Sequence, residues 1–80
     1  MKIKVRVAEK KKVLLPIVTD FIRLDSALKL ANAVSSGGEA KTVVLNGEVK
    51  VGGEVCLQRG KKIREGDEFE FANVIYEVTK

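Results

Sequence analysis

Two groups of residues have the types and spacing needed to bind phosphate. Gly37 and Gly38 precede a predicted helix, where glycines let a phosphate approach the free backbone N–H groups of the first turn. A second segment places four cations within six residues, namely Arg59, Lys61, Lys62 and Arg64. The GxxxxGK[ST] spacing of a P-loop is absent, so nucleotide binding of that kind is not indicated. These residues indicate electrostatic binding of a phosphate-bearing partner.

Both groups also have a purely structural interpretation. The glycine pair can form a tight turn between helices that requires positive φ. The cations can be solvated surface side chains, since acidic residues follow directly within residues 65–70. The four cations nevertheless precede the acids rather than alternating with them, so a hairpin there would separate the two signs onto different faces.

The charge distribution limits where a phosphate-binding surface can lie on the protein. The net charge is +4, but the first twelve residues hold six of the 15 basic side chains and one of the 11 acidic ones. The rest of the chain is therefore slightly acidic, and binding there depends on local placement of charge. The N-terminal stripe of Lys2, Lys4 and Arg6 has two open roles: it extends the binding surface or keeps an edge strand soluble.

Composition argues against other classes of function. The 80 residues include no histidine and the single cysteine Cys56, so a zinc site, an internal disulfide or a Ser-His or Cys-His nucleophile has little basis. The adjacent carboxylates Asp67 and Glu68 lie in a predicted turn without a cleft. Three Phe and one Tyr argue against an aromatic base-stacking platform. We expect a cytoplasmic chain with no catalytic activity, cofactor, membrane span or secretory signal.

The elements that position these residues follow from hydrophobic spacing. Residues 2–8 alternate basic and apolar as a strand does, residues 9–12 form a charged turn, and residues 13–17 return as a second strand that Pro16 confines to an edge or a bend. Residues 49–57 alternate through a strand pair around the turn Gly52-Gly53. Further predicted features are a basic loop over 58–64, a turn at 65–67 and a hairpin tip at 72–73.

Two short helices are predicted in the middle of the chain. The first starts near residues 23–25 and carries an apolar stripe through Val34, with Asp25 and Ser26 in its first turn. The second runs from about residue 38 to residue 45, with Ser36 or Gly37 near its N-cap and Gly47 as its left-handed stop.

In this order and register, residues 21–78 resemble the S4 RNA-binding domain, a small αL module. The matching positions are Arg23-Leu24-Asp25, Leu28, Ser36, Ala40, Gly47, Val49, Val51, Gly53 and Gly66-Asp67. The stretch from Ser36 to Lys41 and the absence of a following domain look most like the small stand-alone members of the YaaA and YbcJ type. One departure is that many S4 domains carry an arginine just after the serine, where this chain has Gly37-Gly38.

The resemblance implies an α+β fold with two short helices on a small antiparallel sheet, preceded by an extra N-terminal strand or hairpin. We expect one domain over residues 1–80, with an N-terminal basic strand extension (1–20) and an S4-like core (21–78). It implies a non-catalytic monomer that binds structured RNA, such as ribosomal RNA, through phosphate and shape contacts, with no small-molecule substrate. The predicted RNA-binding residues are Lys29, Ser36, Gly37, Gly38, Lys41, Lys50, Arg59, Lys61 and Lys62. Backbone amides or Lys41 would replace the missing arginine.

A second function is a protein-interaction adaptor of β-grasp type without RNA binding. Sulfur carriers of that type need an exposed C-terminal Gly-Gly, whereas this chain ends Val78-Thr79-Lys80. In pseudouridine synthases the S4 module is attached to a catalytic domain. Because the chain stops at Lys80, we expect no such activity here.

Overall fold

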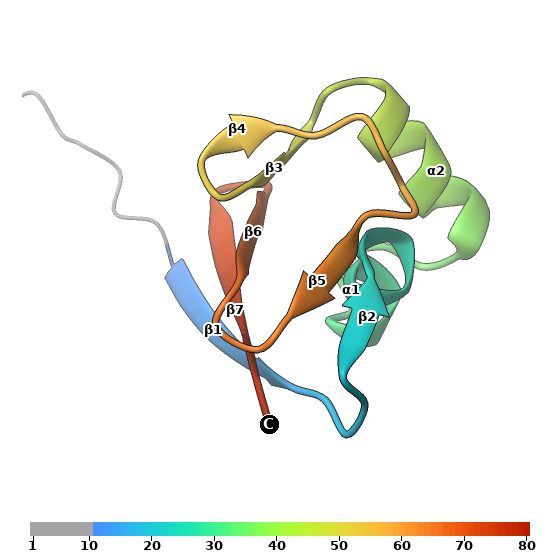
Figure 1. The fold of residues 1–80 in the computed structure, drawn as a ribbon. Helices are drawn as coiled ribbons and strands as arrows, with labels where there is room; N and C mark the ends of the chain where they lie inside the picture. The colour runs from blue at the N-terminus through green and yellow to red at the C-terminus, as the bar shows by residue number, and fades with distance from the viewer. Residues whose placement is uncertain (1–10) are drawn as a thin grey trace, which may run out of the picture.

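The computed structural model of the chain describes residues 11–80, and within that range two short helices pack against a mixed β-sheet. The helices are α1 (Leu24–Leu30) and α2 (Gly37–Leu45). The strands are β1 (Lys11–Pro16), β2 (Phe21–Arg23), β3 (Val49–Val51), β4 (Glu54–Val55), β5 (Lys62–Arg64), β6 (Glu68–Phe71) and β7 (Val74–Thr79). Figure 1 shows the two helices together on one side of the sheet, with the β2–β5 pair beside α1. The architecture is therefore the predicted α+β arrangement.

The five-stranded sheet has the order β1-β7-β6-β3-β4. The strands β7, β6, β3 and β4 pair antiparallel, but β1 pairs parallel with β7 over its whole length, from Lys11 opposite Val74 to Pro16 opposite Thr79. The predicted antiparallel sheet with an extra N-terminal strand is therefore confirmed, and that extra strand runs parallel to its neighbour, a direction that was not predicted. The alternation of residues along a strand indicates which of its faces is buried, but not whether its partner runs parallel or antiparallel. In addition, β7 follows β1 in the sequence only after all the other elements of the core.

β1 also corrects the sequence prediction at its first residues. Lys11 and Lys12 belong to the strand, not to a charged turn, because each pairs with a residue of β7. The prediction for Pro16 is confirmed, since it ends a strand at the edge of the sheet. Lys12 forms ion pairs with Glu77 at 2.9 Å and Glu68 at 3.3 Å, and these carboxylates raise its pKa above the ordinary lysine value. The strand predicted over residues 2–8 lies outside the described residues.

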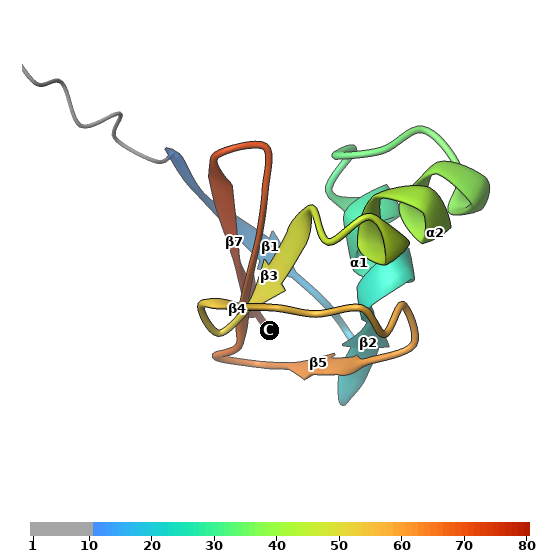
Figure 2. The same cartoon turned by 90° about the horizontal axis from the view of Figure 1, so that it is seen from above.

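A separate two-stranded ribbon consists of β2 and β5, paired antiparallel with Ile22 opposite Ile63. The last three residues of the predicted basic loop thus form a strand: Lys62 and Arg64 are exposed on either side of Ile63, which is fully buried. The apolar residue between two cations is the period-2 pattern of a strand with one buried face. Figure 2 shows this ribbon along one edge of the molecule, where β2 leads directly into α1.

Helix α1 is shorter than predicted, because it ends at Leu30 and not near Val34. Asn32 adopts the left-handed conformation with φ of 58° and donates its N–H to the carbonyl of Lys29, while the N–H of Ala33 bonds the carbonyl of Leu28. This pair of bonds is a Schellman motif, which satisfies the last free carbonyls and stops the helix. Val34 remains buried, but it lies in the connection to α2.

Helix α2 has the predicted ends. The Oγ of Ser36 accepts a hydrogen bond from the N–H of Glu39 at 3.1 Å, which makes Ser36 the N-cap. At the other end Gly47 has φ of 76° and donates to the carbonyl of Val44, as a C′ glycine does. The turns at 52–53, 65–67 and 72–73 are also confirmed, since each contains residues at positive φ between the predicted elements.

The core lies between the helices and the inner face of the sheet. Its largest fully buried side chains are Phe69, Leu24, Leu28, Ile63, Val44, Val49 and Val78. Phe69 stacks on Tyr76 with ring centroids 5.0 Å apart. Because the core fixes α1, α2 and the ribbon against one another, it also fixes the polar groups that they carry outward.

Candidate nucleic-acid interface

The first turn of α2 presents two open backbone donors. Gly37 and Gly38 are the first two residues of the helix, both are exposed, and neither of their N–H groups has an acceptor within residues 11–80. A Cβ at Gly37 would meet no atom within 4 Å, and one at Gly38 would meet only the Oγ of Ser36 at 3.8 Å. Two solvent-facing amides at the positive end of a nine-residue helix can bind an anion such as a phosphate.

The glycine pair is not a positive-φ turn. The glycines at positive φ in the described chain are Gly47, Gly52, Gly53 and Gly66, whereas Gly37 and Gly38 lie inside the helix. The structural interpretation of the pair as a tight turn at positive φ is therefore wrong. Helix formation does not require glycine at these two positions. Because glycine has no side chain, the space next to the two backbone N–H groups is open.

The carboxylate of Glu39 lies in the same helical turn. Its Oε1 accepts hydrogen bonds from the N–H and the Oγ of Ser35, at 2.8 and 3.1 Å. This negative charge opposes an anion at the same helix end, so a bound phosphate needs additional positive charge close by. Lys41, one turn further along α2 and exposed, is the cation on that helix.

The predicted basic loop (residues 58–64) is attached to the start of α1, which is the end of this helix away from the connection to α2. The backbone N–H groups of Leu24 and Asp25, at the start of α1, donate to the carbonyls of Lys61 and Arg59 at 2.8 and 3.0 Å. These bonds satisfy helix donors that no side chain caps, and they fix the turn against α1. The connection to α2 leaves from the other end of this seven-residue helix, which is about 10 Å long.

Eight of the nine predicted residues therefore form two groups and not one cluster. Lys29, Ser36, Gly37, Gly38 and Lys41 lie on the α1–α2 pair, and Arg59, Lys61 and Lys62 lie at the start of α1. The ion pairs within residues 11–80 use Lys12, Arg23 and Lys80 as cations, so none of the six predicted cations is neutralised in this way. They keep their charge available for phosphate.

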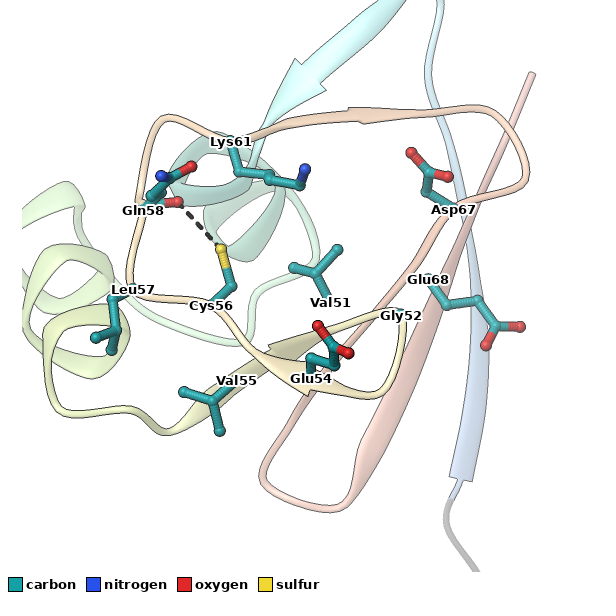
Figure 3. A pocket seen from close by; sticks show the side chains of 10 residues that line it. All are labelled: Val51, Gly52, Glu54, Val55, Cys56, Leu57, Gln58, Lys61, Asp67 and Glu68. Carbon is teal, nitrogen blue, oxygen red and sulfur yellow. Dashed lines mark hydrogen bonds between the residues drawn. The ribbon is translucent and has the colours of Figure 1, made fainter.

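Lys61 is in a different environment from Arg59. It lines an open hollow of about 570 Å³ between the β3–β4 hairpin and the segment from Cys56 to Gln58, together with Glu54, Asp67 and Glu68. The carboxylate of Glu68 pairs with Lys12, and that of Asp67 accepts the N–H of Arg64. Figure 3 shows the Lys61 side chain extending along this hollow and the carboxylate of Glu54 pointing into it. Around Lys61 the two signs are therefore not separated, because the carboxylate of Glu54 points into the hollow that this lysine lines.

Lys50 is not brought to the helices. It lies in β3 between buried Val49 and half-buried Val51, so its side chain is on the outer face of the sheet, away from the core. Glu70 of β6 is directly opposite it in the antiparallel ladder. A cation there belongs to a different face from the α1–α2 pair and has a carboxylate as its cross-strand neighbour.

Sequence reasoning missed Phe21 and Arg23 on the β2–β5 ribbon as parts of a binding surface, and it named Arg64 in the basic segment without including it among the nine RNA-binding residues. Phe21, Arg23 and Arg64 are exposed, and the Cζ of Arg64 lies 5.8 Å from the centre of the Phe21 ring. The guanidinium of Arg23 lies over Gly60 and pairs with Asp25 at 3.2 Å. The signal was the alternation of polar and apolar residues over 62–64, which is the pattern of a strand with one exposed face, whereas residues 21–23 (Phe-Ile-Arg) do not alternate in this way.

Within residues 11–80 no group of three or more acidic, histidine or cysteine side chains is arranged to hold a metal ion. None of the helices in this part of the chain is long and apolar enough to cross a membrane. The arrangement that remains is an exposed helix N-terminus with cations on the same elements.

Comparison with known proteins matches residues 15–79 to the S4 domain. The chain belongs to the S4 domain family. It is 43% identical over 54 residues to the probable ribosome maturation protein RlbA of Bacillus subtilis (strain 168), a match that covers 68% of this chain and 76% of the relative. Membership of the S4 family, with the fold described above, indicates an RNA-binding or ribosome-associated role.

Proposed function

We propose that this S4 protein binds structured RNA without catalysing a reaction, and that the RNA is ribosomal. The observation that carries the proposal is the pair of open amides at Gly37 and Gly38, on a helical pair whose cations Lys29 and Lys41 have no carboxylate partner within residues 11–80. The ribosomal assignment is supported by the name of the relative, a probable ribosome maturation protein.

In this proposal the RNA backbone binds along the helical pair. One phosphate accepts hydrogen bonds from the amides of α2, and neighbouring phosphates are neutralised by Lys29 and Lys41. Arg59 and Lys62, at the start of α1, bind phosphates further along the same RNA. Contacts of this kind carry no base code, so recognition depends on the shape of the folded RNA and the spacing of its phosphates.

Two of the predicted contacts have smaller roles in this proposal. Lys61 shares its hollow with the carboxylate of Glu54, and Lys50 lies on the outer face of the sheet opposite Glu70. Both positions weaken the local positive field, because nearby acids offset the charge of each lysine. The phosphate contacts are therefore assigned mainly to Lys29, Lys41, Arg59 and Lys62, with Ser36 holding the first turn of α2 in shape.

We further propose that the chain acts in the cytoplasm as a monomer and as one domain over residues 1–80, with no small-molecule substrate. The single cysteine supports a reducing compartment. The family match over residues 15–79 supports a single unit. β1 pairs along its length with β7, which supports the inclusion of residues 11–16 in the same unit.

The test is to identify the RNA directly. Ultraviolet crosslinking of the tagged chain in cells, followed by sequencing of the bound RNA, should give ribosomal RNA with reads concentrated at one folded region. A Gly37→Pro, Arg59→Gln variant, measured at equal protein level, should lose most of this signal. Reads spread evenly over messenger RNA, or a variant that crosslinks as well as the parent, would contradict the proposal.

A protein-adaptor function is the second candidate, because an apolar pair is exposed next to α2. Val55 and Leu57 are 53% and 55% exposed, and their side chains lie over Gly47. Pull-down with and without RNase discriminates between the two functions. Partners that survive digestion and are lost in Leu57→Ser would favour protein contacts, whereas partners lost on digestion favour RNA.

A further inference from the structure

The outer face of the β2–β5 ribbon combines one aromatic ring with three cations. In the antiparallel ladder Phe21 is opposite Arg64 and Arg23 is opposite Lys62, so these four side chains share one face. The opposite face carries Ile22 and Ile63, of which Ile63 is fully buried against the core. The face with Phe21 and the cations is therefore exposed to solvent. The opposite face packs on the core, and this packing fixes the position of the two strands.

The ring and the cations are already in contact. The Nζ of Lys62 lies 4.9 Å from the centre of the Phe21 ring, and the Cζ of Arg64 lies 5.8 Å from it. Phe21 nevertheless remains 36% exposed. Within residues 11–80 neither Lys62 nor Arg64 forms an ion pair, while Arg23 is held by Asp25. An exposed ring beside two unneutralised cations suits a ligand with a flat apolar part and a negative part.

We propose that this face binds an unpaired nucleotide of the RNA, with its base stacked on Phe21 and its phosphates held by Lys62 and Arg64. Stacking on an aromatic side chain is the common way in which proteins hold unpaired bases, and every base has a face that can stack. Lys62 has a long flexible stem, so its ammonium can move from the ring to the phosphate when the base arrives. The small number of aromatic residues in the chain is no obstacle, because one base needs one ring.

The position of the ribbon supports RNA as the ligand. β2 continues directly into α1, and β5 directly follows the turn whose carbonyls cap α1. Both strands that form this face are therefore connected directly along the chain to the elements proposed to bind phosphate. This inference rests on the proposed function and makes it more specific: the RNA should be a duplex with a bulged or flanking unpaired base.

The experiment compares two RNAs that share one duplex, of which one carries a single bulged 2-aminopurine. If the proposal holds, the wild-type chain binds the bulged RNA more tightly than the paired one and quenches the 2-aminopurine fluorescence. Phe21→Leu keeps an apolar side chain and should lose roughly fivefold or more in affinity for the bulged RNA. It should also lose the quenching while binding the paired RNA as before. Phe21→Trp should restore both, and thermal melting confirms that each variant folds.

The outcomes separate this inference from the function on which it rests. Equal affinity of the wild type for the two RNAs, or an equal loss for both in Phe21→Leu, would overturn the nucleotide site and leave duplex binding intact. No binding to either RNA would overturn the proposed function as well. If Phe21→Leu affected only an RNase-resistant protein partner, the face would be a protein contact and the proposal would be wrong.

Discussion

Replacing Gly37 by proline tests the backbone contact at the start of α2 without disturbing the fold. Gly37 is the first helical residue, the position at which proline is favoured because its N–H is not used by the helix. Ser36 has φ of −152° and ψ of 165°, the extended conformation required before proline. A Cβ at Gly37 would contact nothing within 4 Å. We expect the free energy of unfolding to stay the same or rise by about 0.4–1 kcal/mol.

Binding should change in the opposite direction. The substitution deletes one of the two open donors, and a hydrogen bond to a charged group contributes about 1.5–3 kcal/mol. The affinity for RNA should therefore fall about tenfold or more. The measurement is fluorescence anisotropy with a labelled fragment of the crosslinked RNA, alongside urea denaturation of the same preparations.

Gly37→Ala is the matched control, because it adds a Cβ in the same open space and keeps the N–H. It should bind close to the wild type while it gains helix stability. If Gly37→Pro bound as tightly as Gly37→Ala, the amide at Gly37 would have no role in binding and the phosphate site would have to be placed elsewhere.

The remaining predictions concern single side chains. Arg59→Ala should weaken RNA binding severalfold more than Lys61→Ala, because Lys61 shares its hollow with the carboxylate of Glu54; equal losses in parallel titrations would show that this carboxylate does not matter. Ser36→Ala should cost about 1 kcal/mol of stability by removing the cap on α2, and an unchanged melting temperature would contradict this role. The raised pKa of Lys12 means that its ion pairs stabilise the fold below about pH 10.5 and are lost as the pH rises through the raised value. The melting temperature of Lys12→Met should therefore lie below that of the wild type at neutral pH and converge with it in strong alkali, and a gap that persists there would refute the assignment.

Local features of the fold could be predicted from the sequence because their causes are local. The cap at Ser36 and the left-handed stop at Gly47 depend on side-chain and backbone preferences within one turn, and both are confirmed. The end of α1 was missed because an apolar stripe continues to Val34, while the signal that stops the helix is Asn32. Asparagine adopts positive φ less readily than glycine, so its role as a stop is harder to predict.

Non-local pairing explains the other errors. The parallel contact between β1 and β7 joins the two ends of the described chain, and no short pattern specifies it. The β2–β5 ribbon likewise joins segments about forty residues apart, which is why Lys62 and Arg64 were placed in a loop. The faces of Lys50 and Lys61 depend on these pairings. The candidate cations could be identified from the sequence, but not which of them lie on the same side of the molecule as α1 and α2.

The salt dependence of RNA binding tests the central claim most directly. Neutralisation of about four phosphates by Lys29, Lys41, Arg59 and Lys62 predicts that log K falls with log salt at a slope of about −3 to −4. Removing one of these cations, as in Arg59→Gln, should reduce the slope by about 0.7–0.9, whereas Lys50→Gln should leave it unchanged. A slope near zero for the wild type would contradict phosphate binding by this surface.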